Sequence, residues 1–197
     1  MRQDSFSADV TEEDPRKELL ILVDDNDNEK GLDTKENCHK GNGLRHRAFG
    51  ILLFEGERLL LQKRSTKKLL WPGYWDVSVA SHVHYGETYE QAGVRRAPQE
   101  LNIDVRPLER IFSFTYRAPF GPYSENEYVV LLEGRVEGVI SPNPEEVSEI
   151  RYITLKELSV DLERESNIYT PWLKIAFEKY LQVLKKDSFP AQVGVFE

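Results

Sequence analysis

Short apolar runs separated by polar turns make up most of the chain between residue 18 and residue 154. Runs of this kind, bounded by Gly, Pro, Asn or Asp, are typical of β-strands joined by turns. The polar segment at residues 24–28 lacks the Gly and Glu that a calcium loop requires, so we expect a plain turn there. The expected strands are residues 18–23, 45–54, 58–62, 76–80, 109–117, 125–133 and 149–154.

Helical signals alternate with these runs. Short helices are expected at residues 33–38 and from residues 155–158, and the Gly-Glu-Thr turn at residues 86–88 opens a longer one. Thr170 followed by Pro171 suits a further helix start, because proline is favoured at the first helical position. Apolar side chains then recur at helical spacing, which indicates a helix that packs on a sheet. They are Trp172, Ile175, Ala176, Tyr180 and Leu184.

Pro98 interrupts the helix expected after residue 88. A proline in a helix interior removes one backbone hydrogen bond and clashes with the preceding turn, at a cost of about 3 kcal/mol. We therefore expect a kink or a break near residues 95–97, which would displace the downstream Glu100.

The mixture of strands and helices along 197 residues indicates an α/β or α+β sandwich. Residues 1–16 are polar and without periodicity, and we expect a disordered tail there. No internal repeat and no domain-scale linker follows, so residues 17–197 are expected to form a single domain.

Composition narrows the function classes. The chain carries 34 acidic and 26 basic residues, a net charge of −8, which argues against a nucleic-acid surface. One cysteine, Cys38, excludes an internal disulfide and suits a reducing compartment. No apolar run approaches the roughly 20 residues that span a bilayer, and the N-terminus lacks a signal-peptide core. We expect a soluble, cytoplasmic protein with no membrane or nucleic-acid partner.

Three histidines and two glutamates form a candidate metal site. His39 and His46 flank a loop that leads into a strand, and His82 follows the central apolar run. Glu125 and Glu127 are two residues apart, so on a strand both carboxylates point to one face. Imidazoles and carboxylates together suit zinc, manganese or another first-row divalent ion. Spacing alone leaves open that each histidine is structural.

Four basic and two aromatic residues also have two interpretations. Lysines and arginines are usually solvated at the surface, and large aromatic side chains usually pack in the core. A diphosphate, in contrast, requires several cationic donors. The residues concerned are Lys35, Arg64, Lys68, Arg96, Tyr116 and Trp172.

The stretch from Trp71 to Glu100 contains Trp-Pro-Gly-Tyr-Trp-Asp-Val-Ser-Val-Ala-Ser-His and a Gly-Glu-Thr turn before a helix. It resembles the Nudix box, and more narrowly the box of type 1 isopentenyl-diphosphate isomerases. The resemblance extends over about residues 19–184. It implies a Nudix-type α/β/α sandwich with a mixed central sheet, and a short prenyl diphosphate as the small-molecule substrate.

The resemblance also implies roles for the candidate residues. The ligands of one divalent ion, zinc or manganese, would be His39, His46, His82, Glu125 and Glu127. Glu100 and the backbone carbonyl of residue 80 would bind a Mg2+ that accompanies the diphosphate, with Glu87 in support. The residues that grip the diphosphate would be Lys35, Arg64, Lys68 and Arg96. Tyr116 and Trp172 would line the hydrocarbon end, where the Trp172 face would stabilise a carbocation.

Departures from the hydrolytic Nudix box favour the isomerase interpretation. Ser81 replaces the leading Gly, and Arg96 and Gln99 replace two glutamates, so that only Glu100 remains of the acidic cluster. Hydrolysis of a phosphoanhydride relies on several carboxylates that hold metals and activate water. One carboxylate suits a bound Mg2+ better than a hydrolytic centre.

Ala80 departs from the isomerase pattern itself. The resemblance places a catalytic cysteine there, across the alkene from Glu127, and alanine cannot exchange a proton. The candidate catalytic residues are thus Glu127, Tyr116 and the position of Ala80. Three explanations of the alanine at position 80 remain open: a natural protein with changed chemistry, an inactive relative, and an engineered replacement of the cysteine. Our first hypothesis is an isomerase with altered or lost activity; the alternatives are a Nudix hydrolase and a non-catalytic prenyl-diphosphate binder.

Overall fold

The computed structural model describes residues 19–188, so the tail expected at residues 1–16 lies outside the described residues. The strands are β1 (Leu20–Val23), β2 (Glu29–Asp33), β3 (His46–Glu55), β4 (Arg58–Arg64), β5 (Trp75–Asp76), β6 (Val79–His82), β7 (Glu109–Phe120), β8 (Tyr123–Arg135) and β9 (Val147–Thr154). The helices are α1 (Lys35–His39), α2 (Tyr89–Leu101), α3 (Leu155–Arg164), the 3-10 helix η2 (Ser166–Ile168) and α4 (Pro171–Ser188).

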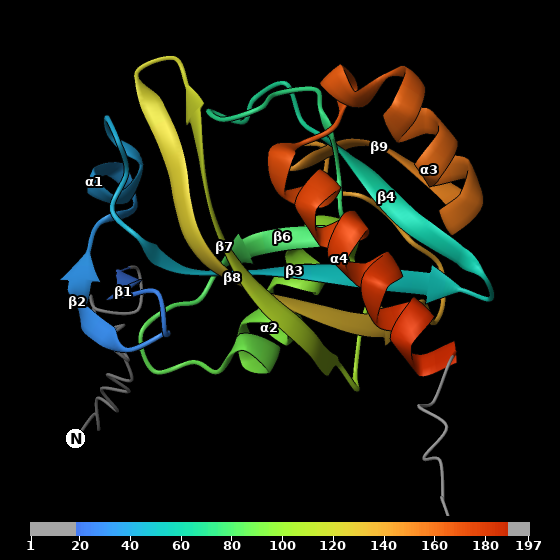
Figure 1. The fold of residues 1–197 in the computed structure, drawn as a ribbon, viewed down its shortest axis with the longest axis horizontal. Coiled ribbons are helices and arrows are strands. Elements are labelled where there is room, and N and C mark those ends of the chain that lie inside the picture. The colour runs from blue at the N-terminus through green and yellow to red at the C-terminus, as the bar shows by residue number, and fades with distance from the viewer. Residues whose placement is uncertain (1–18, 189–197) are drawn as a thin grey trace, which may run out of the picture.

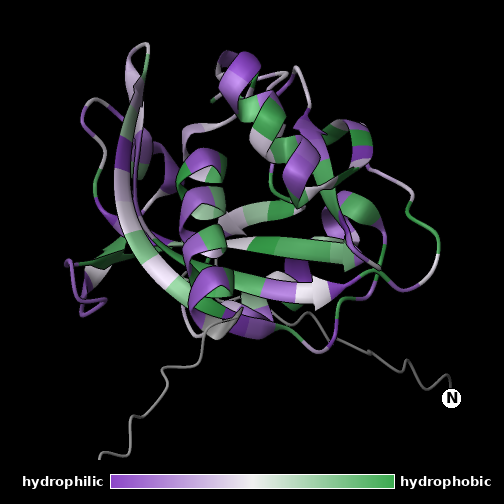
Figure 2. Ribbon diagram, turned by 45° about the vertical axis from the view of Figure 1, so that its right-hand side comes forward, coloured by the Kyte–Doolittle hydropathy of each residue, from purple (hydrophilic) through white to green (hydrophobic). Residues whose placement is uncertain are grey.

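β3 lies at the centre of a mixed sheet (Figure 1). It runs antiparallel to β1, β4 and β6, and parallel to β8 along the whole register from His46↔Glu127 to Phe54↔Arg135. Its central residues form a nearly continuous apolar run, which is typical of a strand buried on both faces. In Figure 2 this strand is mostly hydrophobic, whereas α4 alternates hydrophobic and hydrophilic positions.

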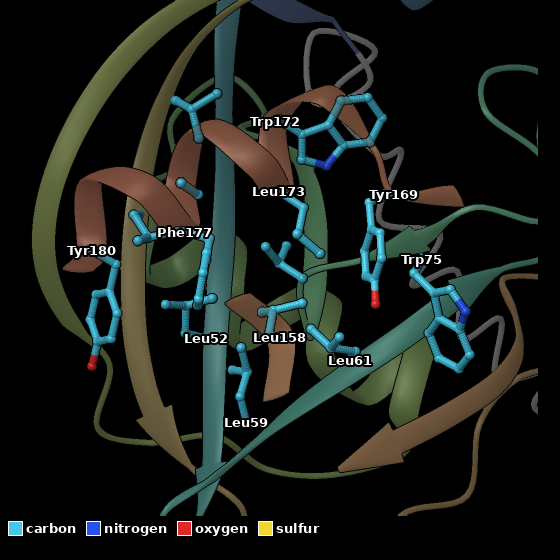
Figure 3. Packing of buried hydrophobic residues seen from close by; sticks show 14 of the residues in the cluster. Leu52, Leu59, Leu61, Trp75, Leu158, Tyr169, Trp172, Leu173, Phe177 and Tyr180 are labelled. Carbon is cyan, nitrogen blue, oxygen red and sulfur yellow. The ribbon is translucent and has the colours of Figure 1, made fainter. Parts of the chain in front are cut away.

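Alternate side chains of β3 enter two cores, one on each face of the sheet. Leu52 packs in a core with Leu158 of α3 and Phe177 of α4 (Figure 3). Its neighbour Ile51 belongs to the other core, which includes Ala92 of α2. Helices therefore cover both faces, and the expected α/β/α sandwich with a mixed central sheet is confirmed.

The break expected near Pro98 is wrong, because α2 continues through it to Leu101. Pro98 is exposed and lies in the last turn, so the one backbone hydrogen bond that it removes, to the carbonyl of Val94, affects only the end of the helix. Asn102 closes the helix in the left-handed conformation, with φ 56°, and donates its N–H to the carbonyl of Pro98. The helix start is as expected: Thr88 is the N-cap and forms a capping box with Gln91.

The single strand expected at residues 76–80 is also wrong, since it consists of two short strands. β5 pairs with β4, whereas β6 pairs with β3. Between them, the Ser78 hydroxyl donates to the carbonyl of Leu60 and accepts the N–H of Leu53. One buried side chain thus bridges the gap where β3 and β4 separate, a contact that no local pattern indicates.

Other boundaries differ from expectation. β2 was not expected, because Glu-Lys-Gly-Leu-Asp lacks apolar alternation; it pairs with β1 alone. α3 begins at Leu155, as expected, and extends to Arg164. β7 and β8 are longer than expected and join at a tight turn at Gly121.

Within residues 19–188, no helix has both the length and the apolar character needed to cross a membrane.

Gly93 sets the distance between α2 and the sheet. A Cβ at this position would lie 2.7 Å from Leu108 Cδ1 and 3.2 Å from Ile51 Cδ1. We predict that Gly93→Val lowers the free energy of unfolding by about 1–3 kcal/mol through overpacking. The measurement is urea denaturation followed by circular dichroism. Lys179→Val, at an exposed site of α4, controls for the helix propensity of valine and should cost less than about 1 kcal/mol. Equal losses in both variants would contradict close packing at Gly93.

Candidate active site

A cavity of about 420 Å3 lies beside β3, β6, β7, β8 and the start of α4. Three kinds of side chain line it. The polar ligand-type residues are His39, His82, Glu125 and Glu127, the cations are Lys35, Arg64, Lys68 and Arg96, and the aromatic residues include Tyr116 and Trp172. Residues from distant parts of the sequence thus share one cavity.

The three histidine rings form a nearly equilateral triangle. The ring centroids are 4.9 Å apart for His39 and His46, 5.0 Å for His39 and His82, and 4.9 Å for His46 and His82. One ligand atom from each ring and one from Glu125 all lie within 4.8 Å of one another. Each ring comes from a different element, namely α1, β3 and β6.

Both glutamates of β8 face this triangle. Glu125 Oε2 lies 3.0 Å from His39 Nε2. Glu127 Oε1 lies 3.3 Å from His82 Nε2 and 3.6 Å from His46 Nε2. The expectation that residues 125 and 127 point to one face is confirmed, because both lie on a regular strand.

The donor set fits a divalent metal ion. Nδ1 of His39 and Nδ1 of His46 each lie within hydrogen-bond distance of a backbone carbonyl, at 2.6 and 2.7 Å. A carbonyl only accepts, so Nδ1 carries the proton and the Nε2 lone pair points into the cluster. His46 Nε2 and Glu125 Oε2 are buried and make no hydrogen bond. Buried polar atoms without partners are costly, and a shared metal ion would satisfy both.

The protonation state of His82 also suits a metal ligand. Burial, with the neighbouring His46 and His39, lowers the pKa of His82, which favours the neutral ring that binds metals.

Tyr116 and Glu127 form a buried pair next to the cluster. The phenol donates to Glu127 Oε2 at 2.6 Å. Burial and the adjacent Glu127 raise the pKa of Tyr116 well above its ordinary value, so the phenol keeps its proton. The carboxylate of Glu127 therefore lies between a neutral donor and the histidine triangle.

Three of the cations interact closely. Burial, then the charges of Lys68 and Arg96, lower the pKa of Lys35. Glu146 bridges the other two: it accepts from Lys68 Nζ and, at 2.5 Å, from Arg96 Nη2. Although burial opposes its ionisation, Lys68 and Arg96 hold the pKa of Glu146 below the ordinary value. The cavity thus contains a cationic surface that already binds one carboxylate.

The fourth cation has different partners. Arg64 donates to the carbonyls of Leu70 and Trp71 and, at 3.1 Å, to Asp76. Its guanidinium carbon lies 5.2 Å from the ring centre of Trp172. Arg64 therefore lines the cavity and also holds the neighbouring loop at Leu70 and Trp71 in place.

The NUDIX domain family matches residues 44–173. An isopentenyl-diphosphate Delta-isomerase of Haloarcula marismortui is 36% identical over 89% of this chain and 97% of its own length. The human isopentenyl-diphosphate delta-isomerase 2 is 37% identical over 84% of this chain and 83% of its own length. The chain belongs to the isopentenyl-diphosphate isomerase family.

Solved structures agree on the fold of this isomerase-family chain. The Deinococcus radiodurans protein DR0079 is 26% identical, with a TM-score of 0.61 over 75% of this chain and 90% of its own. A MutT NUDIX hydrolase from Burkholderia pseudomallei, at 19% identity and a TM-score of 0.57, covers 68% of this chain and 96% of its own length. The second likeness concerns the fold alone.

Two acidic residues of the Nudix-type box of this isomerase-family chain, Glu87 before α2 and Glu100 on it, do not line the cavity. Glu100 is 1% exposed and accepts from Gln62 Nε2 at 3.0 Å and from Arg96 Nε at 2.8 Å. Glu87 accepts from Arg95 and from the N–H of His84, which fixes the turn before α2. Both carboxylates have protein partners, and neither lines the cavity described above.

Ala80 and Cys38 differ in their access to the isomerase-type cavity. Ala80 lines the cavity from β6, opposite Gly50 in the strand register. Cys38 is fully buried and is not among the lining residues. Burial, with the nearby Asp33, raises the pKa of the Cys38 thiol to about 12. The Cys38 thiol therefore does not reach the cavity and cannot replace the thiol that the family resemblance places at position 80.

Two carboxylates of the site were missed from the sequence. Glu146 belongs to a loop whose contacts with Lys68 and Arg96 span 78 and 50 residues, so nothing local signals them. Asp76 had a signal: it is a lone carboxylate between Trp75 and Val77 in a buried apolar run. A charge in such a position needs hydrogen-bond or ion-pair partners, so this pattern indicates a buried polar contact at Asp76.

We predict that His46→Gln lowers retention of a divalent metal. Protein loaded with Zn2+ or Mn2+ and then dialysed should keep about one ion per chain, since three histidines and a carboxylate form a complete ligand set. Metal content is measured by atomic emission. His84→Gln is the matched control, because His84 lies outside the cluster. Equal retention by the two variants would contradict a metal site at the triangle.

We predict that Cys38 resists alkylation in the folded protein. With a thiol pKa of about 12 and no exposed surface, iodoacetamide at pH 8 should label it at least about a hundredfold more slowly than in urea. Mass spectrometry of the intact chain measures the modified fraction over time. Rapid labelling without denaturant would show that the thiol is accessible.

Proposed function

We propose that the chain is an isopentenyl-diphosphate isomerase-type enzyme that binds a short prenyl diphosphate and protonates its alkene. The observation that carries the proposal is the buried hydrogen bond between Tyr116 and Glu127 in the same cavity as the cations and Trp172. A proton donor beside an apolar aromatic surface and a cationic surface suits a substrate with an alkene and a diphosphate. The isomerase relatives support the same substrate class.

The cationic surface is proposed to bind the diphosphate. Lys35, Lys68 and Arg96 lie close enough to influence one another, and Glu146 shows that an anion fits between two of them. A diphosphate would displace this carboxylate, because it offers more oxygens and more charge. Glu100 is proposed to hold the accompanying Mg2+ once Arg96 turns toward the substrate.

Proton transfer is proposed to involve Glu127. In its protonated form, Glu127 would deliver the carboxyl proton to the terminal alkene carbon. The Tyr116 hydroxyl would hold the carboxyl group in position and stabilise the carboxylate that is left. A zinc or manganese ion held by the histidines and Glu125 would orient Glu127 and tune its acidity when bound. Trp172 would stabilise the tertiary cation that forms.

Ala80 limits the second half of the reaction. Its methyl group cannot accept the proton that must leave the cation for the double bond to shift. We infer that isomerisation is slow or absent for this reason, whereas binding and protonation are retained. A cytoplasmic location is part of the same proposal.

Two alternatives have specific support. Hydrolysis of a diphosphate is suggested by the Nudix fold but is disfavoured by Glu100, the single remaining cluster carboxylate, which is paired with Arg96. Binding without catalysis is favoured by Ala80. The isomerase proposal accounts best for the buried pair of Tyr116 and Glu127.

We predict that Ala80→Cys raises isomerisation by at least about a hundredfold, since one missing acid or base costs about that much. Labelled isopentenyl diphosphate is incubated with Mg2+ and Zn2+ or Mn2+, and the dimethylallyl product is separated from released phosphate. Ala80→Cys combined with Glu127→Gln is the control and should stay inactive. Phosphate release would support the hydrolase. A variant that binds substrate yet forms no isomer would refute the proposal.

A further inference from the structure

Asp76 is a fully buried carboxylate with four donors from three elements or their ends. Oδ1 accepts from the Val77 N–H at 2.8 Å, from Trp172 Nε1 at 2.6 Å and from the Thr170 hydroxyl at 3.2 Å. Oδ2 accepts from Arg64 Nη1 at 3.1 Å. Every contact uses an oxygen as acceptor, which is the arrangement of an ionised carboxylate.

A buried charge is not by itself a stabilising feature. A buried ion pair costs desolvation energy, and apolar residues of similar volume often serve stability as well or better. Asp76 nevertheless lies within the aromatic core and bonds to Arg64 and Trp172, which both line the cavity. Buried charges of this kind are concentrated at functional sites.

Two of the side chains that donate to Asp76, those of Arg64 and Trp172, also contact each other. The guanidinium of Arg64 lies 5.2 Å from the ring centre of Trp172. A cation at this distance is attracted by the ring and makes its potential less negative for a second cation. A carboxylate that pairs with Arg64 and accepts the indole N–H acts in the opposite direction, because it neutralises the guanidinium and pushes electron density into the ring.

The ring is also held in place by its neighbours. The ring centre of Trp71 lies 5.1 Å from that of Trp172, nearly perpendicular to it, and Tyr116 lies 5.9 Å away. Figure 3 shows Trp172 at the start of α4, above the core. Its only polar atom bonds to Asp76, so this bond fixes the rotation of the indole in its plane.

We propose that Asp76 is a positioning residue that orients Trp172 and keeps its face able to stabilise a cationic carbon in the presence of Arg64. This inference rests on the proposed function, because it assumes a cationic intermediate beside Trp172. It assigns to Asp76 a role that acts through the indole and not through contact with substrate.

The test compares two diphosphate esters by isothermal titration calorimetry. One carries a tertiary ammonium group in place of the tertiary carbon, and the other is the neutral saturated isopentyl ester. The ratio of the two dissociation constants measures how well the site stabilises a positive charge at this carbon. The measurement needs no turnover, so the missing acid–base group at Ala80 does not affect it. Asp76→Asn keeps the size and an acceptor oxygen but removes the charge. It should reduce the preference for the ammonium ester about tenfold, with affinity for Mg2+-pyrophosphate changed less than about threefold.

Two further variants sharpen the test. Asp27→Asn is the matched control, since Asp27 also pairs with an arginine and a phenol but lies outside the cavity, and it should keep the preference. Arg64→Met combined with Asp76→Asn removes both charges and should restore most of the preference. The double variant also keeps the test available if Asp76→Asn alone fails to fold.

A spectroscopic signature accompanies the binding data. In 15N-labelled protein, the indole proton of Trp172, assigned with Trp172→Phe, should resonate furthest downfield of the three tryptophans and move upfield in Asp76→Asn. A preference that survives in Asp76→Asn, with the indole signal shifted, would overturn this inference alone. Wild-type protein that binds neither ester would refute the proposed function and this inference with it.

Discussion

The pairing of β3 with β6 and β8 is the constraint on which the candidate site depends. The register sets His46 opposite Glu127 and Ala48 opposite His82. Because side chains alternate along a strand, a slip of one residue would turn these ligands to the opposite face. The two apolar cores fix that register, since alternate residues of β3 must enter different cores. The same packing that stabilises the sheet therefore places two histidines and a glutamate together.

The third histidine, His39, reaches the cluster from the end of a short helix rather than from a strand. His39 ends α1, and the loop after it is bound to β8 by several contacts: the N–H of Gly41 donates to the Pro122 carbonyl, and the Asn126 side chain donates to the carbonyl of Gly43. Gly43 has φ +70°, and a Cβ there would approach Cys38, Ser124 and Asn126 at 3.1 Å. Glycine is required by both the conformation and the close approach. His39 thus meets Glu125 because the loop and the strand are tied together.

Much of this arrangement follows from local patterns, and the exceptions have physical causes. The apolar run of β3, the helix start after the Gly-Glu-Thr turn and the Thr170–Pro171 start all depend on neighbours in the sequence, and each was correctly predicted. The partners of Ser78, Asp76 and Glu146 could not be found in this way, because most of them lie 12 to 96 residues away. The alternation of Glu125 and Glu127 predicted their shared face, but only the β3 register brings them to His46. The break expected at Pro98 was wrong because the sequence did not reveal that the helix ends three residues later, at Leu101.

Position 80 shows how chemistry and fold are separated in this site. Ala80 is held by backbone pairing with Gly50, which does not depend on the side chain. The ligands at His82 and Glu127 are fixed by the same ladders, and the cations by α1, β4 with the loop after it, and α2. A change at residue 80 therefore alters which proton transfers are possible while the histidine cluster, the cationic surface and the indole of Trp172 keep their places. For this reason the binding of a cationic diphosphate ester reports on the site more directly than turnover does.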